Sequence, residues 1–148
     1  MSKPRYDWWG HARNIAAGWQ ELKKEYDDLH EANITVQLSG MPPGGNVSRG
    51  TEDVALRTLK EYQQQRYDAG VFAMSEIKKI WGRDGEKVIR LIFWNKRQKL
   101  NIAGAGEKVG FSERTARRIH WRFILAIGRG MNWITIEEYN QAIKKDNN

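Results

Sequence analysis

The stretch that decides the fold is VGFSERTARRIHWRF, residues 109–123. Gly110 and Ser112 stand on either side of Phe111, and this pattern is typical of a tight turn that leads into a helix. Glycine adopts positive φ without strain, and serine caps the N-termini of helices. Apolar residues then recur at helical spacing as far as Phe123. The sequence therefore predicts a helix that begins after Ser112 and follows a sharp turn.

The segment before the turn, residues 102–109, predicts a first helix of the same motif. Gly106 is small enough to let two helices cross steeply at close range, and the spacing of the two helices is that of a helix-turn-helix. Each interior glycine costs about 1 kcal/mol relative to alanine. Because Gly104 and Gly106 weaken this helix, we expect tertiary packing to hold it.

The second helix concentrates basic residues. A helical wheel predicts a buried stripe of Ala116, Ile119, Phe123 and Ile127, with arginines, Trp121 and Leu125 on the opposite face. The N-terminal residues of recognition helices reach base edges, and arginine forms bidentate hydrogen bonds with guanine or phosphate. Trp121 fits either a sugar–phosphate contact or a contact with the N-terminal helices, and the second is favoured. The predicted DNA-binding residues are Ser112, Glu113, Arg114, Thr115, Arg117, Arg118, Trp121 and Arg122.

The charge of the chain is unevenly distributed. The 148 residues carry a net charge of +7. Residues 1–82 hold 11 basic and 11 acidic residues, whereas residues 83–148 hold 14 basic and 7 acidic residues. A field of one sign suits a polyanionic partner, whereas a merely solubilising surface mixes both signs. The charge pattern therefore places the expected nucleic-acid contact in the C-terminal half.

The N-terminal half predicts two long helices. A 3.5-residue period typical of a coiled coil begins at Trp8 and ends at Val36. Glycines and prolines at residues 39–50 predict a loop after this period ends. Thr51 is then predicted to cap a second helix that continues towards Gly82. We expect a helical hairpin, closed within one chain or between two. The seam of the first helix is Trp8, Ala12, Ile15, Trp19, Leu22, Tyr26, Leu29, Asn33 and Val36.

The predicted fold class is therefore all-α, with a long coiled-coil-like helical hairpin followed by a helix-turn-helix DNA-binding domain. Residues 1–82 form the hairpin or oligomerisation region. Residues 83–148 form the DNA-binding domain, with a short apolar helix over 86–93 and a basic connection over 95–101. A capping box from Thr135 to Glu138 predicts a final helix to about Lys145, which would cover the core or an oligomer contact.

The sequence offers no arrangement of residues for catalysis. It contains no cysteine, its three histidines lack metal-ligand spacing, and no glycine-rich phosphate loop of the Walker type occurs. We therefore expect a protein that is not an enzyme and that uses no metal and no cofactor. No long apolar run indicates a membrane segment or a secretion signal, so we expect no membrane association and a cytoplasmic location.

Two parts of the chain resemble known families. Residues 86–93, the stretch Val109-Gly110-Phe111-Ser112-Glu113-Arg114 and the following helix resemble region four of bacterial sigma factors. Leu38-Ser39-Gly40-Met41-Pro42-Pro43-Gly44-Gly45 between two long helices resembles RinA/ArpU-type late-gene transcriptional regulators of phages of Gram-positive bacteria. The resemblance extends from about Asp27 to Gly130. Residues 103–106 depart from the sigma pattern, which has a threonine, acidic residues and an Ile-Ala pair there.

This resemblance implies a sequence-specific double-stranded DNA-binding protein that activates a phage or prophage operon in a bacterial host cell. Its implied partners are double-stranded DNA and host RNA polymerase, and the heptad pattern of the first helix leaves a homodimer open. Glu113, Arg114, Arg117 and Arg118 match the contact positions of the second helix. Two alternatives stay open: a DNA-packaging adaptor of the small-terminase type, and a helical scaffold that binds an acidic protein.

Overall fold

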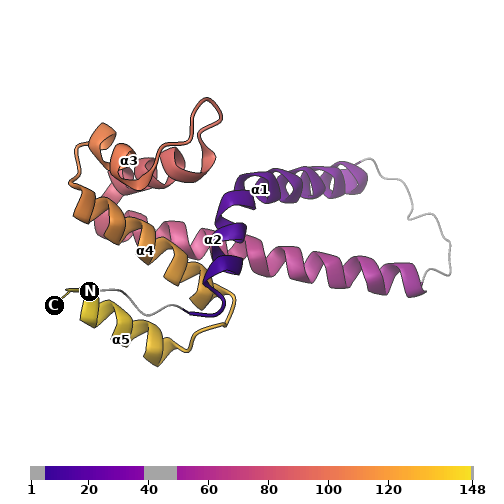
Figure 1. Cartoon of the computed structure of the whole chain (residues 1–148). Coiled ribbons are helices and arrows are strands. Elements are labelled where there is room, and N and C mark those ends of the chain that lie inside the picture. The colour runs from indigo at the N-terminus through magenta and orange to yellow at the C-terminus, as the bar shows by residue number, and fades with distance from the viewer. Residues whose placement is uncertain (1–5, 39–49, 148) are drawn as a thin grey trace.

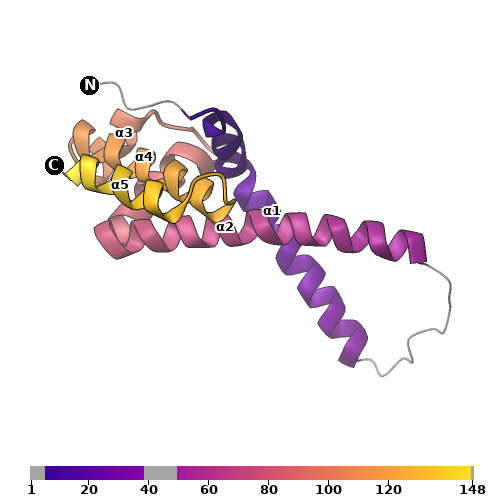
Figure 2. The ribbon, with the colours of Figure 1, turned by 90° about the horizontal axis from the view of Figure 1, so that it is seen from below.

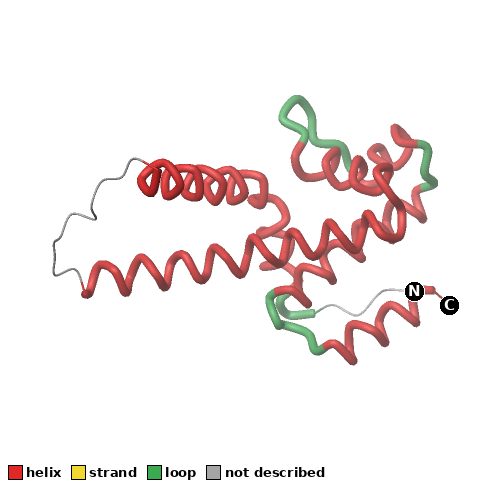
Figure 3. The backbone as a smooth tube through the Cα atoms, turned by 180° about the vertical axis from the view of Figure 1, so that it is seen from behind, coloured by secondary structure: helices red, strands yellow, loops and turns green. Residues whose placement is uncertain are grey.

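The computed structural model describes the backbone of residues 6–38 and 50–147 and the side chains of residues 6–28 and 61–147. Every regular element in these ranges is a helix, so the predicted all-α class is confirmed (Figure 3). The loop predicted at residues 39–50 lies, except for Gly50, outside the described residues. The elements, drawn in Figure 1, are α1 (Trp9–Leu38), α2 (Gly50–Ile89), the π-helical turn η1 (Arg90–Trp94), α3 (Ile102–Val109), α4 (Glu113–Gly130) and α5 (Ile136–Asn147).

Gly82 interrupts α2. Its backbone angles, φ 69° and ψ −156°, lie outside the helical region and are readily adopted by glycine. A long helix therefore ends at this residue, and a shorter one continues into η1. The helix boundary predicted at Gly82 is confirmed. The sequence predicted an ordinary helix over 86–93, whereas its last turn is the wider π-helical winding of η1.

α1 packs against α2 within the same chain. Trp19 is buried, and its indole Nε1 donates a hydrogen bond to the carbonyl oxygen of Tyr67 at 3.2 Å. Tyr26 stacks on the same tyrosine, with ring centroids 4.2 Å apart. Figure 2 shows that the two helices cross at an angle and then project away from the other helices. Among the predicted seam residues up to Tyr26, whose side chains are described, Ala12, Ile15 and Trp19 are buried.

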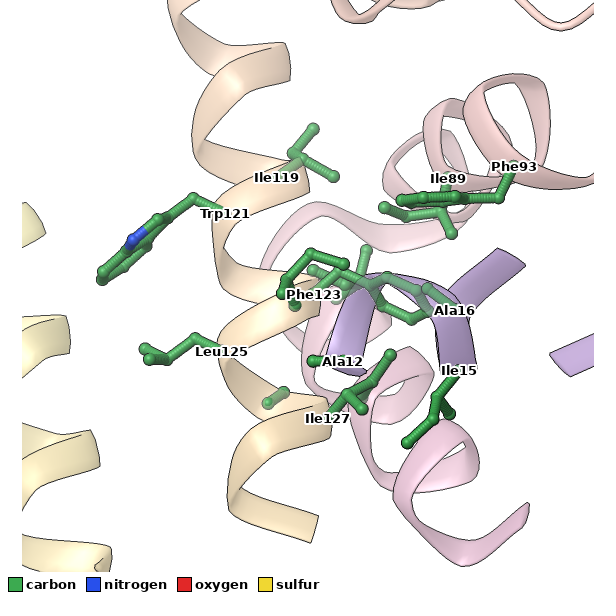
Figure 4. Packing of buried hydrophobic residues seen from close by; sticks show 14 of the residues in the cluster. Ala12, Ile15, Ala16, Ile89, Phe93, Ile119, Trp121, Phe123, Leu125 and Ile127 are labelled. Atoms are coloured by element: carbon green, nitrogen blue, oxygen red, sulfur yellow. The ribbon is translucent and has the colours of Figure 1, made fainter. Parts of the chain in front are cut away.

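α4 is the central helix of the core. Its eight residues from Trp121 to Gly128 are all buried, and α1, α2, α3 and α5 all contact this helix. In Figure 4, Phe123 and Ile127 point towards α1 and α2, whereas Trp121 and Leu125 point towards α5. A helix buried on every side lies in the interior of a protein. The predicted regions 1–82 and 83–148 therefore share one continuous core.

A glycine brings α4 and α2 into close contact. A Cβ atom placed on Gly130 would lie 2.6 Å from the Cα and 2.7 Å from the Cβ of Ala69, which is itself fully buried. Real Cβ atoms do not approach other carbons this closely. The absence of a side chain at residue 130 therefore sets the separation of α2 and α4.

Aromatic rings attach the first turns of α1 to the end of α4. Trp8 stacks on Tyr6 with a centroid distance of 4.9 Å and lies 6.2 Å from Trp133, which follows α4. Farther along α1, Trp94 of η1 donates a hydrogen bond from Nε1 to the carbonyl oxygen of Ala16 at 2.7 Å. These contacts hold the start of α1 beside α4 and the connection that follows η1.

Candidate nucleic-acid interface

α3 contains two glycines, but its N-terminus is capped and one of its sides packs against α4. The Asn101 side chain caps the helix and accepts a hydrogen bond from the Gly104 amide at 2.7 Å. A Cβ atom on Gly106 would lie 2.6 Å from the Cβ of Ala116 on α4. The predicted role of Gly106 as the small residue at the helix crossing is confirmed, and packing against α4 holds this helix as expected.

The turn between α3 and α4 follows local rules that the sequence reveals. Gly110 ends α3 with φ 99°, and its amide donates to the carbonyl oxygen of Gly106 at 2.9 Å. Ser112 caps α4 by accepting a hydrogen bond from the Thr115 amide at 3.2 Å. Its hydroxyl also donates to Thr115 Oγ1 at 3.1 Å. The positive φ predicted for Gly110 and the cap predicted at Ser112 are both confirmed.

The first turns of α4 present three charged side chains to solvent. Arg117 and Glu113 are 63% and 56% exposed, and Arg117 Nη2 lies 2.7 Å from Glu113 Oε1. The Arg117 Nε donates to the same carboxylate oxygen at 3.1 Å. Arg114 is also exposed, and none of the ion pairs within the described residues includes it. Within the described residues, Arg114 is therefore an exposed cation of the predicted set that no ion pair holds.

Arg118 is held by the C-terminal helix. Its side chain is 34% exposed, and its Nε donates to Asp146 Oδ2 at 3.1 Å. Its Nη2 donates to Asn147 Oδ1 at 3.1 Å. The guanidinium thus lies at the edge of the exposed surface of α4 and is oriented by the last turn of α5.

Trp121 and Arg122 lie in the interior, which corrects their predicted placement on an exposed face. Each is only 7% exposed. The indole of Trp121 points towards α5, so it does not lie on the exposed face where the sequence placed it (Figure 4). Arg122 is paired with Glu76 of α2, with 3.7 Å between Nη2 and Oε2. The helical wheel failed here because α2 and α5 cover a face of α4 that the sequence made polar.

Tyr139 of α5 completes the buried group around Arg122. Its hydroxyl donates to Glu76 Oε2 at 3.0 Å, and the Arg122 guanidinium lies over its ring at 5.7 Å. Burial raises the pKa of Tyr139 to about 12, in spite of the opposing charge of Arg122. This residue therefore keeps its neutral phenol well above the pH at which an exposed tyrosine ionises.

The raised pKa of Tyr139 predicts a loss of stability in alkali. The unfolded tyrosine titrates near 10, so the stabilising contribution is complete below pH 10 and is lost as the pH rises towards 12. It amounts to roughly 2 to 3 kcal/mol. We expect the melting temperature of the Tyr139→Phe variant to fall less steeply between pH 10 and pH 12 than that of the wild type. Equal slopes in thermal melts across this range would contradict the assignment.

Comparison with known proteins gives no match: no family model matches the chain, and no curated protein or solved structure is significantly similar to it. Within the described residues, no cluster of three or more His, Cys, Asp or Glu side chains is arranged to hold a metal ion. No helix in the described ranges is both long enough and apolar enough to cross a bilayer.

The structure adds cations that the sequence analysis did not place in the site. The connection between η1 and α3 carries Lys96, Arg97 and Lys99, all exposed. Lys99 lines the same groove as Arg117 of α4, and so does Arg13 of α1. The available signal was the run from Lys87 to Gly106, which contains five basic residues and no acidic residue. No local pattern predicted that Arg13 lies beside it.

Proposed function

We propose that the chain is a sequence-specific double-stranded DNA-binding transcriptional regulator, in which α3 and α4 act as a helix-turn-helix and α4 is the recognition helix. The observation that carries this proposal is the division of α4. Its first turns expose Arg114 and Arg117, while its second half is fixed in the core. A rigid helix with a capped, basic and exposed N-terminal end is suited to insertion into the major groove.

The residues proposed to face DNA form two groups: those exposed as candidates for base contacts, and those that lie beside them. Arg114 and Arg117 are the candidates for base contacts, because both are exposed on the N-terminal turns. Glu113 orients Arg117 through their ion pair. Arg118, Ser112 and Thr115 lie beside them, and Arg118 is held by α5. Trp121 and Arg122 are not part of the proposed contact set because they are buried.

The wider biological role rests on the resemblance to RinA/ArpU-type regulators. On that basis the proposed target is a phage or prophage operon, with activation through host RNA polymerase in the bacterial cytoplasm. Only the DNA-binding part of this proposal is argued from the described residues, namely those of α3 and α4. The proposal assigns no catalytic activity to the chain.

The function is tested by selecting duplexes from a random-sequence library with the purified protein. We expect one consensus sequence to be enriched. Binding to it should survive random competitor DNA, and log K should fall with log salt by about 0.9 for each phosphate engaged. Binding that any DNA removes equally would contradict sequence-specific regulation. The assembly state, measured by light scattering, separates a regulator, expected as a monomer or dimer, from a packaging adaptor, expected as a large ring.

Arg114→Ala is expected to weaken binding to the selected sequence by about 1 to 3 kcal/mol, because a bidentate contact to a base would be lost. Binding to random duplex should change far less, and the consensus should become degenerate at one position. The matched control is Lys24→Ala, which removes an exposed cation of α1 that does not line the groove with Arg117. An Arg114→Ala protein with the affinity and consensus of the control would remove this residue from the contact set.

A further inference from the structure

A groove of about 940 Å³ lies where three parts of the chain meet. The first turns of α1 form one side, the connection after η1 forms another, and the N-terminal turns of α3 and α4 complete it. Three cations from three different elements line it: Arg13 from α1, Lys99 from the connection and Arg117 from α4. The groove therefore joins the N-terminal part of the chain to the surface proposed to bind DNA.

The lining of this groove is both charged and apolar. Asp7 and Glu113 are its two carboxylates, and Glu113 is already paired with Arg117 at 2.7 Å. Ile92, Phe93 and Leu100 supply apolar surface. A sugar–phosphate backbone has matching chemistry, because its phosphates are anionic and its deoxyribose rings present carbon atoms. A free inorganic anion would not make use of the apolar part.

We propose that this groove binds the sugar–phosphate backbone of the DNA next to the bases that α4 reads, with Arg13 and Lys99 as phosphate contacts. The inference rests on the proposed function. Arg117 connects the two surfaces, because it is exposed on the first turns of α4 and also lines the groove. A duplex that contacts Arg117 therefore has the groove directly beside it.

The position of Arg13 is fixed well enough for such a contact. The first turns of α1 are held by Trp8 near Trp133 and by the hydrogen bond from Trp94 to the carbonyl of Ala16. Phosphate contacts set the register of a protein on the duplex and carry no sequence information themselves. α1 thus belongs to the DNA-binding surface as well as to the packing of the two long helices.

The test compares Arg13→Ala and Lys99→Ala with Lys24→Ala, an exposed α1 cation outside the groove. Each groove variant is expected to lose roughly fivefold in affinity near 0.1 M salt, for selected and random duplex alike, and about 0.9 in the slope of log K against log salt. The selected consensus should not change. Arg13→Lys should restore the slope, because the charge is retained, and thermal melting confirms that each variant folds.

The possible failures are distinguishable. If the wild type binds the selected duplex and both groove variants match Lys24→Ala in affinity and salt slope, the groove assignment is overturned and the proposed function stands. If the wild type shows no salt-dependent duplex binding, the proposed function itself fails. If Arg13→Ala and Lys99→Ala lose binding of pyrophosphate but keep full duplex affinity, the groove binds a small anion and the backbone assignment is again overturned.

Discussion

Glu76→Ala is expected to lower the free energy of unfolding by about 3 kcal/mol, because it leaves a buried arginine without its charged partner. Arg122 is 7% exposed, and its Nη2 lies 3.7 Å from Glu76 Oε2. The same carboxylate oxygen accepts the hydrogen bond from the Tyr139 hydroxyl at 3.0 Å. The substitution removes both interactions at once. The Arg122 Nε is also buried without a hydrogen-bond partner within the described residues.

Chemical denaturation of a small set of variants measures this effect. Glu76→Gln keeps an acceptor for Tyr139 and removes only the charge, so it should lose less stability than Glu76→Ala. The double variant Glu76→Leu with Arg122→Met replaces the pair by apolar side chains of similar size. It should recover most of the loss, since removing both buried charges is often nearly neutral. A Glu76→Ala protein as stable as the wild type would show that Arg122 reaches solvent in solution.

The Arg122→Met single change also bears on the corrected DNA-binding set. Arg122 of α4 is buried against α2 and α5. Its replacement should therefore affect the stability of the fold and leave the selected DNA consensus unchanged. A change in the consensus without a change in stability would return Arg122 to the contact surface.

Gly130→Val is expected to lower the free energy of unfolding by about 3 kcal/mol, near the upper part of the range for overpacked cores. The new Cβ would meet the Cα and Cβ of Ala69 at 2.6 and 2.7 Å, and backbone atoms cannot rotate out of the way as a side chain does. α2 and α4 would therefore have to separate. Since α4 contacts every other α-helix of the described chain, the loss should spread through the core.

The matched control for Gly130→Val is Gly18→Ala. Gly18 lies within α1, is exposed, and has no atom within 4 Å of the position that a Cβ would take. Alanine there should stabilise the protein by roughly 0.5 to 1 kcal/mol, because glycine is a poor residue for a helix interior. Gly130→Val should therefore lower the melting temperature, whereas Gly18→Ala should raise it. Equal melting temperatures for both variants would contradict the close contact of α2 and α4.

Local chemistry explains which parts of the fold were predictable. The positive φ of Gly110 and the helix cap of Ser112 depend only on residues close by in the sequence. Both could therefore be predicted from the sequence. Gly106 was also predictable, because the short turn forces its helix to cross the next one. The 3.5-residue period predicted a long α1 and a buried side for it, but not the angle at which α1 crosses α2 (Figure 2).

Burial by distant elements explains what was missed. Trp121 and Arg122 occupy a face of α4 that looks polar in isolation, and only the packing of α5 and of Glu76 on α2 makes it interior. Arg13 and Lys99 come together because α1 folds back beside the connection after η1. The charge run predicted a basic surface, but no spacing rule links two residues so far apart in the chain.

The division of α4 has an evolutionary consequence. Its exposed residues Glu113, Arg114 and Arg117 are followed by a run of eight residues that the core holds on all sides. On the proposed function, DNA specificity can drift through substitutions in one and a half helical turns without altering the packing that keeps the helix in place. Recognition and folding are encoded one after the other on the same helix, so a lineage can acquire a new operator while retaining its scaffold.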